Sequence, residues 1–388
     1  MKYITRTVWI LSLVSLFTDT ASEMLYPVMP VYLKSIGFSV VLIGMLEGVA
    51  EATAGLSKGY FGKRSDLSGK RVPFVQAGYA FSAISKPMLA LFVYPVWIFF
   101  SRTIDRFGKG LRTGARDAIL SDEATAETKG KVFGFHRSMD TLGAVLGPLF
   151  ALLYLYYHPE NYKPLFLIAF IPGLLAVSAS FFLKRKKRIT KTEKVSVPFF
   201  SFLKYWKVSP PEYRKLVVGL LIFTLFNSSD VFLLLKIKQS GFSDTMVIGV
   251  YIFYNLVYAL FAFPVGIIAD NIGLKKIFVG GLGMFAIVYF GMALNNHLYL
   301  FFVFFFLYGV YASATEGISK AWISNISSKK DTATAIGTYS GLQSICAMVA
   351  STLTGVLWYS FGAATAFIIT GVVTVLVIFY FLFILRIN

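Results

Sequence analysis

The stretch "GKRSDLSGKR" (residues 62–71) stands at the end of an apolar run, and "GIIADNIGLKK" (residues 266–276) repeats its pattern 204 residues later. In each copy a glycine is followed by an aspartate, then by a second glycine at the same spacing, and then by two bases. A weaker repeat pairs "ETKGKVFG" (127–134) with "KKDTATAIG" (329–337). Two echoes at nearly the same offset predict that the chain is an internal duplication.

The composition is that of a membrane protein. The chain has 388 residues, of which 56% are hydrophobic and only 14% charged, and its mean hydropathy is +0.69. A soluble domain would carry about 25% charged residues. Apolar runs of about 18 to 25 residues recur along the chain, which predicts an all-α polytopic membrane protein rather than a β-barrel. The first apolar segment has no small-residue cleavage site and is interpreted as a retained span.

The apolar runs predict twelve transmembrane helices. They lie at residues 8–34, 41–61, 73–92, 93–113, 131–157, 164–183, 215–236, 245–269, 276–294, 298–320, 334–358 and 363–385. Both copies of each repeat fall on one side of the membrane, which predicts two parallel six-helix bundles, residues 1–183 and 215–388. The segment 184–214 is predicted to be a cytoplasmic basic linker, whose aromatic part could instead lie on the anionic inner leaflet as an amphipathic helix.

The distribution of charge indicates how the chain lies in the bilayer. The formal net charge is +18, and lysines and arginines gather in every second loop. This positive-inside pattern predicts an inner-membrane protein with both termini in the cytoplasm, and it explains the charge without a nucleic-acid partner. The chain has one cysteine and three widely separated histidines, so no thiolate or local histidine metal motif is present in the sequence.

With these features the chain resembles a transporter of the Major Facilitator Superfamily over essentially its whole length. The family's motif between spans two and three is G-x-x-x-D-(R/K)-x-G-(R/K)-(R/K), and the first repeat matches it except at Leu67, where the family has a base. The resemblance implies two six-helix bundles related by pseudo-two-fold symmetry. It also implies a cytoplasmic gate in which each loop aspartate meets nearby bases and the N-terminus of a helix from the other half. The gate residues are Gly62, Asp66, Arg71, Gly266, Asp270 and Lys275.

Span five is similar to the family's antiporter motif, G-x8-G-x3-G-P-x2-G-G. The matching residues are Gly134, Gly143, Gly147 and Pro148, whereas Ala151 and Leu152 replace the final glycine pair. These small residues either allow helices to pack closely or provide a bend that helps to switch access. The charged stretches around spans four and five are also similar to a bacterial branch of the superfamily that includes efflux and metal-resistance proteins.

Span four carries an unusual amount of charge. Its continuation "DRFGKGLRTGARD" (105–117) holds four basic and two acidic side chains. At 1.5 Å per residue, Arg102 lies about 14 Å from a helix start near Val93, close to mid-membrane. Helical periodicity places six charged residues within an arc of about 120°. They are Arg102, Asp105, Arg106, Lys109, Arg112 and Arg116. Such a stripe must face protein or an aqueous cavity, because each central charge facing lipid would cost about 2.5–3.5 kcal/mol.

Other spans supply ionisable residues that can meet this stripe. Two pairs of carboxylates are spaced i, i+4 on single helical faces, Asp19 with Glu23 and Glu47 with Glu51. The remaining members are His136, Arg137 and Asp140 in span five, Asp230 in span seven and Glu316 in span ten. A buried carboxylate near a base can hold a proton in one access state and lose it in the other. These residues, with Arg102, Asp105 and Arg106, are predicted to form the proton-coupling and substrate cavity; ion pairs that merely hold helices together are the alternative.

The pattern predicts a secondary active transporter working by alternating access, not an enzyme. No G-x-x-x-x-G-K-[ST] pattern occurs in the sequence, so we expect the proton gradient, and no cofactor, to supply the energy. The expected cargo is a small polar, anionic or zwitterionic organic solute, exported by a monomer in the lipid bilayer in exchange for protons. Two alternatives stay open: a divalent metal cation exporter that uses the carboxylates of spans one and two, and a lipid or glycolipid flippase on the same fold.

Overall fold

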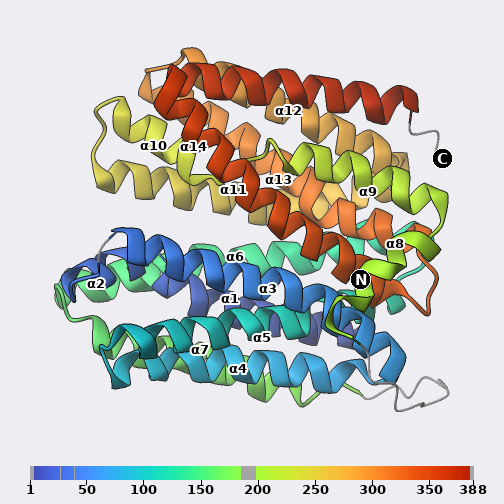
Figure 1. The fold of residues 1–388 in the computed structure, drawn as a ribbon, viewed down its shortest axis with the longest axis horizontal. Helices are drawn as coiled ribbons and strands as arrows, with labels where there is room; N and C mark the ends of the chain where they lie inside the picture. The colour runs from blue at the N-terminus through green and yellow to red at the C-terminus, as the bar shows by residue number, and fades with distance from the viewer. Residues whose placement is uncertain (1–3, 27, 39, 185–197, 385–388) are drawn as a thin grey trace. The chain divides into compact units, whose positions relative to one another are not determined.

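The computed structural model describes residues 4–26, 28–38, 40–184 and 198–384, and every regular element among them is a helix (Figure 1). The first half of the chain forms α1 (Arg6–Leu25), α2 (Met29–Ser35), α3 (Val40–Ser68), α4 (Arg71–Leu91), α5 (Pro95–Asp122), η1 (Ala126–Thr128), α6 (Lys129–Tyr157) and α7 (Tyr162–Ser180). The second half forms η2 (Phe199–Lys204), α8 (Tyr205–Val208), α9 (Pro211–Thr224), α10 (Val231–Gln239), α11 (Asp244–Ile272), α12 (Leu274–Leu294), α13 (Leu298–Ile326), α14 (Thr332–Phe379) and η3 (Tyr380–Ile384).

Two predicted spans are interrupted. The first, 8–34, is divided into α1 and α2, and the seventh, 215–236, is divided into α9 and α10. The prediction of one continuous helix was wrong at both places. The sequence has a proline at the first interruption, and the polar run "NSSD" (227–230), whose side chains compete for backbone hydrogen bonds, at the second. The last two predicted spans lie in α14, which changes direction at Gly362, where φ is 84°.

Within the described ranges, seven helical segments are long and apolar enough to cross a membrane. Helix α5 is not among them, because its ionisable residues lower its hydropathy. Large apolar side chains are widely exposed on the helices, and Val96, Tyr156 and Leu376 have exposed fractions of 82%, 78% and 61%. Apolar side chains exposed along long helices are favourable in contact with lipid and unfavourable in contact with water, so this surface is typical of a membrane protein.

The helices form two compact units. The first unit comprises residues 1–123, 139–208 and 328–344, and the second comprises 124–138, 209–327 and 345–388. In the first unit α5 packs against α3 and α4, and α7 packs against α1 and α4. In the second unit α13 packs against α11 and α12. The shared arrangement of α5 and α13, each against two neighbours, is what the internal duplication predicts.

The end of the predicted linker is ordered in the first unit. Phe202 in η2 is 2% exposed, and its ring lies so close to Gly59 of α3 that a Cβ there would come within 2.5 Å. The Nζ of Lys63 donates a hydrogen bond of 2.8 Å to the Ser201 carbonyl oxygen. Phe200, in contrast, is 58% exposed. This part of the linker is therefore anchored on α3 by Phe202 and by Phe199, whose ring centroid lies 5.1 Å from that of Tyr60, while residues 185–197 lie outside the described part of the chain.

Candidate functional site

The charged stripe of α5 lies against protein, as its periodicity predicted. Its buried members are Arg102, Asp105, Arg112 and Arg116, whereas Arg106 is half-buried and Lys109 is exposed. On the other side of the helix, Phe100 is 51% exposed. The stripe is thus buried at most positions and accessible at Arg106 and Lys109.

Part of the stripe is bonded to the neighbouring helices. The Nζ of Lys86 in α4 lies 2.8 Å from Asp105 Oδ1 and 3.1 Å from the Ser22 hydroxyl in α1. The guanidinium of Arg112 donates a hydrogen bond of 2.6 Å to Ser82. These buried contacts fix α5 against α4 and α1, so that Asp105 is held by a base within the helix packing.

Two glycines of the antiporter-like motif bring α6 into close contact with α1. A Cβ at Gly143 would collide with the Leu16 carbonyl oxygen and lie 2.9 Å from the Thr20 amide nitrogen. A Cβ at Gly147 would lie 2.6 Å from the Met24 amide nitrogen. The glycines therefore serve close backbone packing. Helix α6 continues from Lys129 to Tyr157 with Pro148 inside it, and a bend that switches access stays a prediction.

This packing places two carboxyl groups together in the first unit. Asp140 is one turn before Gly143, and its carboxyl group lies within hydrogen-bonding reach of the Asp19 carboxyl group. The Ser15 hydroxyl donates a second hydrogen bond to Asp140 Oδ1. An ionised carboxylate has only acceptor oxygens, so a hydrogen bond between two carboxyl groups requires a proton on one of them. The pair is therefore suited to hold one proton.

Other acids and bases surround this pair. Lys109 lies near enough to interact electrostatically with Asp19, Glu23 and Glu51, and Arg106 interacts with Glu23 and Glu51. These six residues, including Asp140, form what we term the acid–base cluster of the first unit. Arg102 is close to Asp105 and Glu51. The side chain of Glu47 lies outside the described residues.

The ionisable residues of span five are divided between the two units. Asp140 belongs to the acid–base cluster, whereas Arg137 belongs to the second unit, where its Nε donates to the Tyr258 hydroxyl and its Nη2 lies 3.4 Å from Glu316 Oε2. His136 is buried at 4% exposure. Asp230 is also in the second unit and accepts a hydrogen bond from the Tyr308 hydroxyl.

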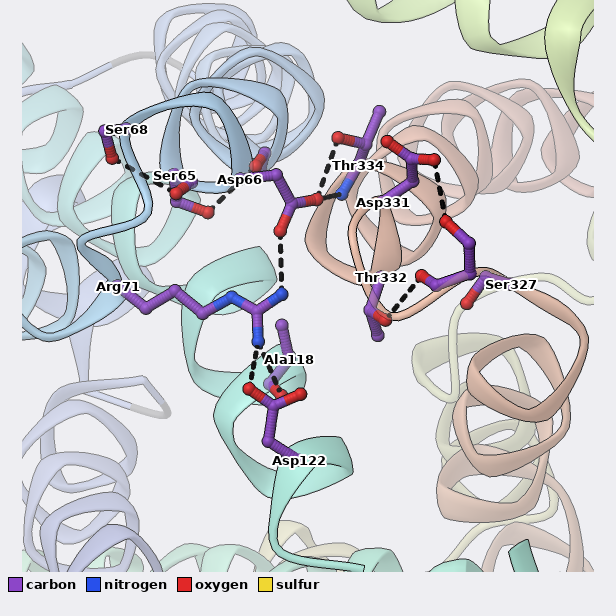
Figure 2. Close-up of polar contacts among 12 residues, drawn as sticks. Ser65, Asp66, Ser68, Arg71, Ala118, Asp122, Ser327, Asp331, Thr332 and Thr334 are labelled. Atoms are coloured by element: carbon purple, nitrogen blue, oxygen red, sulfur yellow. Dashed lines mark hydrogen bonds and ion pairs between the residues drawn. The ribbon is translucent and has the colours of Figure 1, made fainter. Parts of the chain in front are cut away.

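The first copy of the repeated motif was expected in a loop, but Gly62 and Asp66 lie in the last turns of α3, and the motif forms the contacts that Figure 2 shows. Asp66 accepts hydrogen bonds from the Thr334 amide and hydroxyl, at 2.7 and 2.9 Å, near the N-terminus of α14. Arg71 donates to Asp66 at 2.8 Å and to Asp122 at 2.6 Å. Gly62 packs so closely on the backbone of Ala333 that a Cβ would not fit. The carboxylate thus meets a base and the positive end of a helix, as the resemblance implied.

The second copy of the motif lies at the end of α11 rather than in a loop, and Asp270 makes contacts with a helix N-terminus within the second unit. Asp270 accepts hydrogen bonds from the amides of Gly130 and Lys131, at 2.7 and 2.8 Å, at the start of α6. Gly266 packs directly on Gly130. Lys275 is half-buried near the start of α12. Both motif aspartates therefore cap a helix that begins in a distant part of the sequence.

Replacing Asp270 by alanine should lower the stability of the protein by about 0.5–2 kcal/mol, because the first amides of α6 lose their acceptor. Thermal unfolding of the purified protein in detergent measures the effect. Asp270→Asn is the matched control, since asparagine caps helices about as well as aspartate. Equal losses in the two variants would contradict a capping role.

Sequence reasoning missed several residues of these sites. Ser15 is one helical turn before Asp19, which is a local signal for a shared face. Thr334 lies in the weaker repeat, so the sequence indicated that its segment matters but not that Thr334 contacts Asp66. The tyrosines around Asp230 gave no signal, since aromatic residues are common in membrane spans. Among the described residues no group of three or more His, Cys, Asp and Glu side chains is placed to hold a metal ion.

Comparison with known proteins assigns the family. The family model described as the Major Facilitator Superfamily matches residues 11–254 and 232–388. An uncharacterized MFS-type transporter of Methanocaldococcus jannaschii is 31% identical over 363 residues, covering 92% of this chain and 89% of that protein. Citrate exporter 1 of Aspergillus niger is 23% identical over 168 residues, which are 43% of this chain and 32% of that protein.

Solved structures share the fold at low sequence identity. The human organic anion transporter TETRAN has a TM-score of 0.79 at 16% identity, covering 97% of this chain and 99% of its own. The fucose:proton symporter of Escherichia coli has a TM-score of 0.78 at 10% identity, covering 98% of both chains. With its all-helical fold, its apolar helices and its repeated loop motif, the chain belongs to the Major Facilitator Superfamily, whose members are transmembrane transporters of small molecules and not enzymes.

Proposed function

We propose that the protein is a secondary active transporter of the inner membrane that exports a small polar, anionic or zwitterionic organic solute in exchange for protons. The observation that carries the proposal is the contact between the Asp19 and Asp140 carboxyl groups. A site that holds one proton between two acids, beside Lys109, can release it when the local charge or hydration changes. Alternating access changes both.

The bases of the acid–base cluster support an anionic group on the cargo. Arg106 is half-buried and Lys109 is exposed, so both side chains can reach a solute. A guanidinium binds a carboxylate through two parallel hydrogen bonds, and its charge is permanent. The citrate exporter and the human organic anion transporter are named for anionic cargo, which supports the same choice here.

The proposed direction rests on the partial antiporter motif in α6. Two of its glycines, Gly143 and Gly147, join α6 to α1 beside the Asp19–Asp140 pair, so this part of the motif adjoins the proposed proton site, whereas Gly134 packs on α11. Protons that enter down their gradient would then drive the solute outward.

Reconstituted protein tests the proposal. Liposomes with an imposed pH gradient and an internal pH dye are exposed to a panel of organic acids and amino-acid-like zwitterions. We expect proton movement only when a transported solute is added, and none in liposomes without protein. Proton movement that is the same with and without every added solute would contradict coupled transport. Lipid scrambling without solute-dependent proton movement would favour the flippase.

A further inference from the structure

The interrupted seventh span leaves a stretch of non-helical backbone within a predicted membrane segment. Helix α9 ends at Thr224 and α10 begins at Val231, and the residues between them are not helical. Irregular backbone at membrane depth is tolerated where it is buried in protein or lines an aqueous cavity. Asn227 and Asp230 lie in this stretch, and both side chains are half-buried rather than closed off. The break therefore presents a carboxyl group and an amide where a solute can reach them.

Tyrosines from two helices hold these polar side chains in place. The Tyr308 hydroxyl of α13 donates to Asp230 Oδ1 at 2.6 Å, and Tyr254 of α11 also hydrogen-bonds Asp230. Asn227 Nδ2 donates to the Tyr311 hydroxyl at 3.0 Å. The ring centroid of Tyr308 lies 5.1 Å from that of Tyr254 and 5.2 Å from that of Tyr311. These three rings, the tyrosine cluster, form a rigid aromatic wall beside the carboxyl group.

The charges around Asp230 do not balance. In the described part of the chain Asp230 forms no ion pair with a lysine or arginine. The charged group with the largest electrostatic effect on Asp230 is another acid, Glu316, whose Oε2 lies 3.4 Å from Arg137 Nη2. Glu316 therefore has a base beside it, whereas Asp230 has no such ion pair among the described residues. An uncompensated carboxylate at membrane depth is costly, so a proton or a bound cation must neutralise it.

We propose that Asp230, Asn227 and the tyrosine cluster form a subsite for a positively charged ammonium group of the solute, which competes with a proton for the Asp230 carboxylate. This inference rests on the proposed function and narrows its cargo to zwitterionic solutes. Aromatic rings attract organic cations, whereas a divalent metal ion requires about six oxygen ligands, and the site offers one carboxylate. The buried Asn227 Oδ1 has no partner and supplies an additional acceptor.

The test compares two molecules of the same shape. Choline and 3,3-dimethylbutan-1-ol differ in that carbon replaces the charged nitrogen, and sodium chloride controls for ionic strength. A ligand that binds the folded state raises its unfolding temperature. We expect choline to stabilise the purified wild-type protein, and the alcohol and salt to do so much less. Equal shifts for choline and the alcohol, or no shift for choline, would overturn the proposal.

Variants locate the effect at the carboxylate. In Asp230→Asn the dissociation constant for choline should rise about 30-fold or more, since a desolvated charge partner is lost. Glu127→Gln removes an exposed acid of the same unit and should leave choline binding unchanged. Undiminished choline binding by Asp230→Asn would overturn the assignment.

A second measurement needs no variant. Choline binding to the wild-type protein should weaken as the pH falls, because protons occupy the carboxylate. The titratable groups that face Asp230 are Glu316, Tyr308 and Tyr311 of α13, Tyr254 of α11 and Tyr289 of α12. A pH-independent affinity would refute the competition. Both measurements detect binding without flux, so choline binding with no coupled transport would refute the proposed function and leave the subsite standing.

Discussion

Asp19→Asn is expected to abolish solute-driven proton movement while the protein stays folded. The carboxamide keeps the shape of the side chain and can donate a hydrogen bond to ionised Asp140, so the contact between α1 and α6 is preserved. It cannot bind or release a proton. Proton flux in proteoliposomes should therefore fall to the level of protein-free liposomes, and uphill movement of the solute should stop.

A second assay separates coupling from translocation. Exchange of labelled for unlabelled solute at equal pH requires alternating access but no net proton transfer, so it should continue in Asp19→Asn. Asp140→Asn should behave in the same way, because the two residues share one site. Glu212→Gln, which removes an exposed acid at the start of α9, is the matched control. Coupled flux that survives in both pair variants would show that the proton is carried elsewhere.

Lys86→Met is expected to destabilise the protein by about 3–5 kcal/mol. The Lys86 and Asp105 side chains are 3% and 10% exposed, and their charged atoms are 2.8 Å apart. Removal of the lysine leaves a buried carboxylate, which Arg102 and Arg106 offset only in part. Denaturant unfolding in detergent micelles measures the loss.

A double variant tests whether the pair itself is responsible. Asp105→Asn in the Lys86→Met background removes the stranded charge and should recover most of the lost stability. If Lys86→Met alone costs less than about 1 kcal/mol, the pair behaves as a solvated one and does not fix α5 against α4.

Features that depend on local sequence could be predicted. The charged stripe of α5 follows from helical periodicity and the cost of charge in lipid, and its burial agrees with both. The contacts of Asp66 and Asp270 with helix N-termini agree with the repeated motif that is visible in the sequence. Most helices begin and end within a few residues of the predicted spans. Hydropathy and spacing are one-dimensional properties, so they determine these features well.

Features that depend on distant contacts could not be predicted. The pairing of Asp19 with Asp140 results from the close approach of α1 at Gly143 and Gly147, which no local pattern encodes. Neighbours in sequence were also separated, since Asp140 and Arg137 take part in different units. The break before α2 was missed because hydropathy is insensitive to a single proline, and the break before α10 because hydropathy averages over several polar residues within an apolar run.

The exchange of segments between the two units bears on how the protein is made. The first unit includes residues 328–344, which carry Thr334, the partner of Asp66. A ribosome that adds about 5–20 residues per second reaches residue 344 roughly 7–27 seconds after residue 208. During that interval the nascent first unit lacks the helix N-terminus that Asp66 caps. The contact between Asp66 and Thr334 can therefore form only after nearly the whole chain has been made.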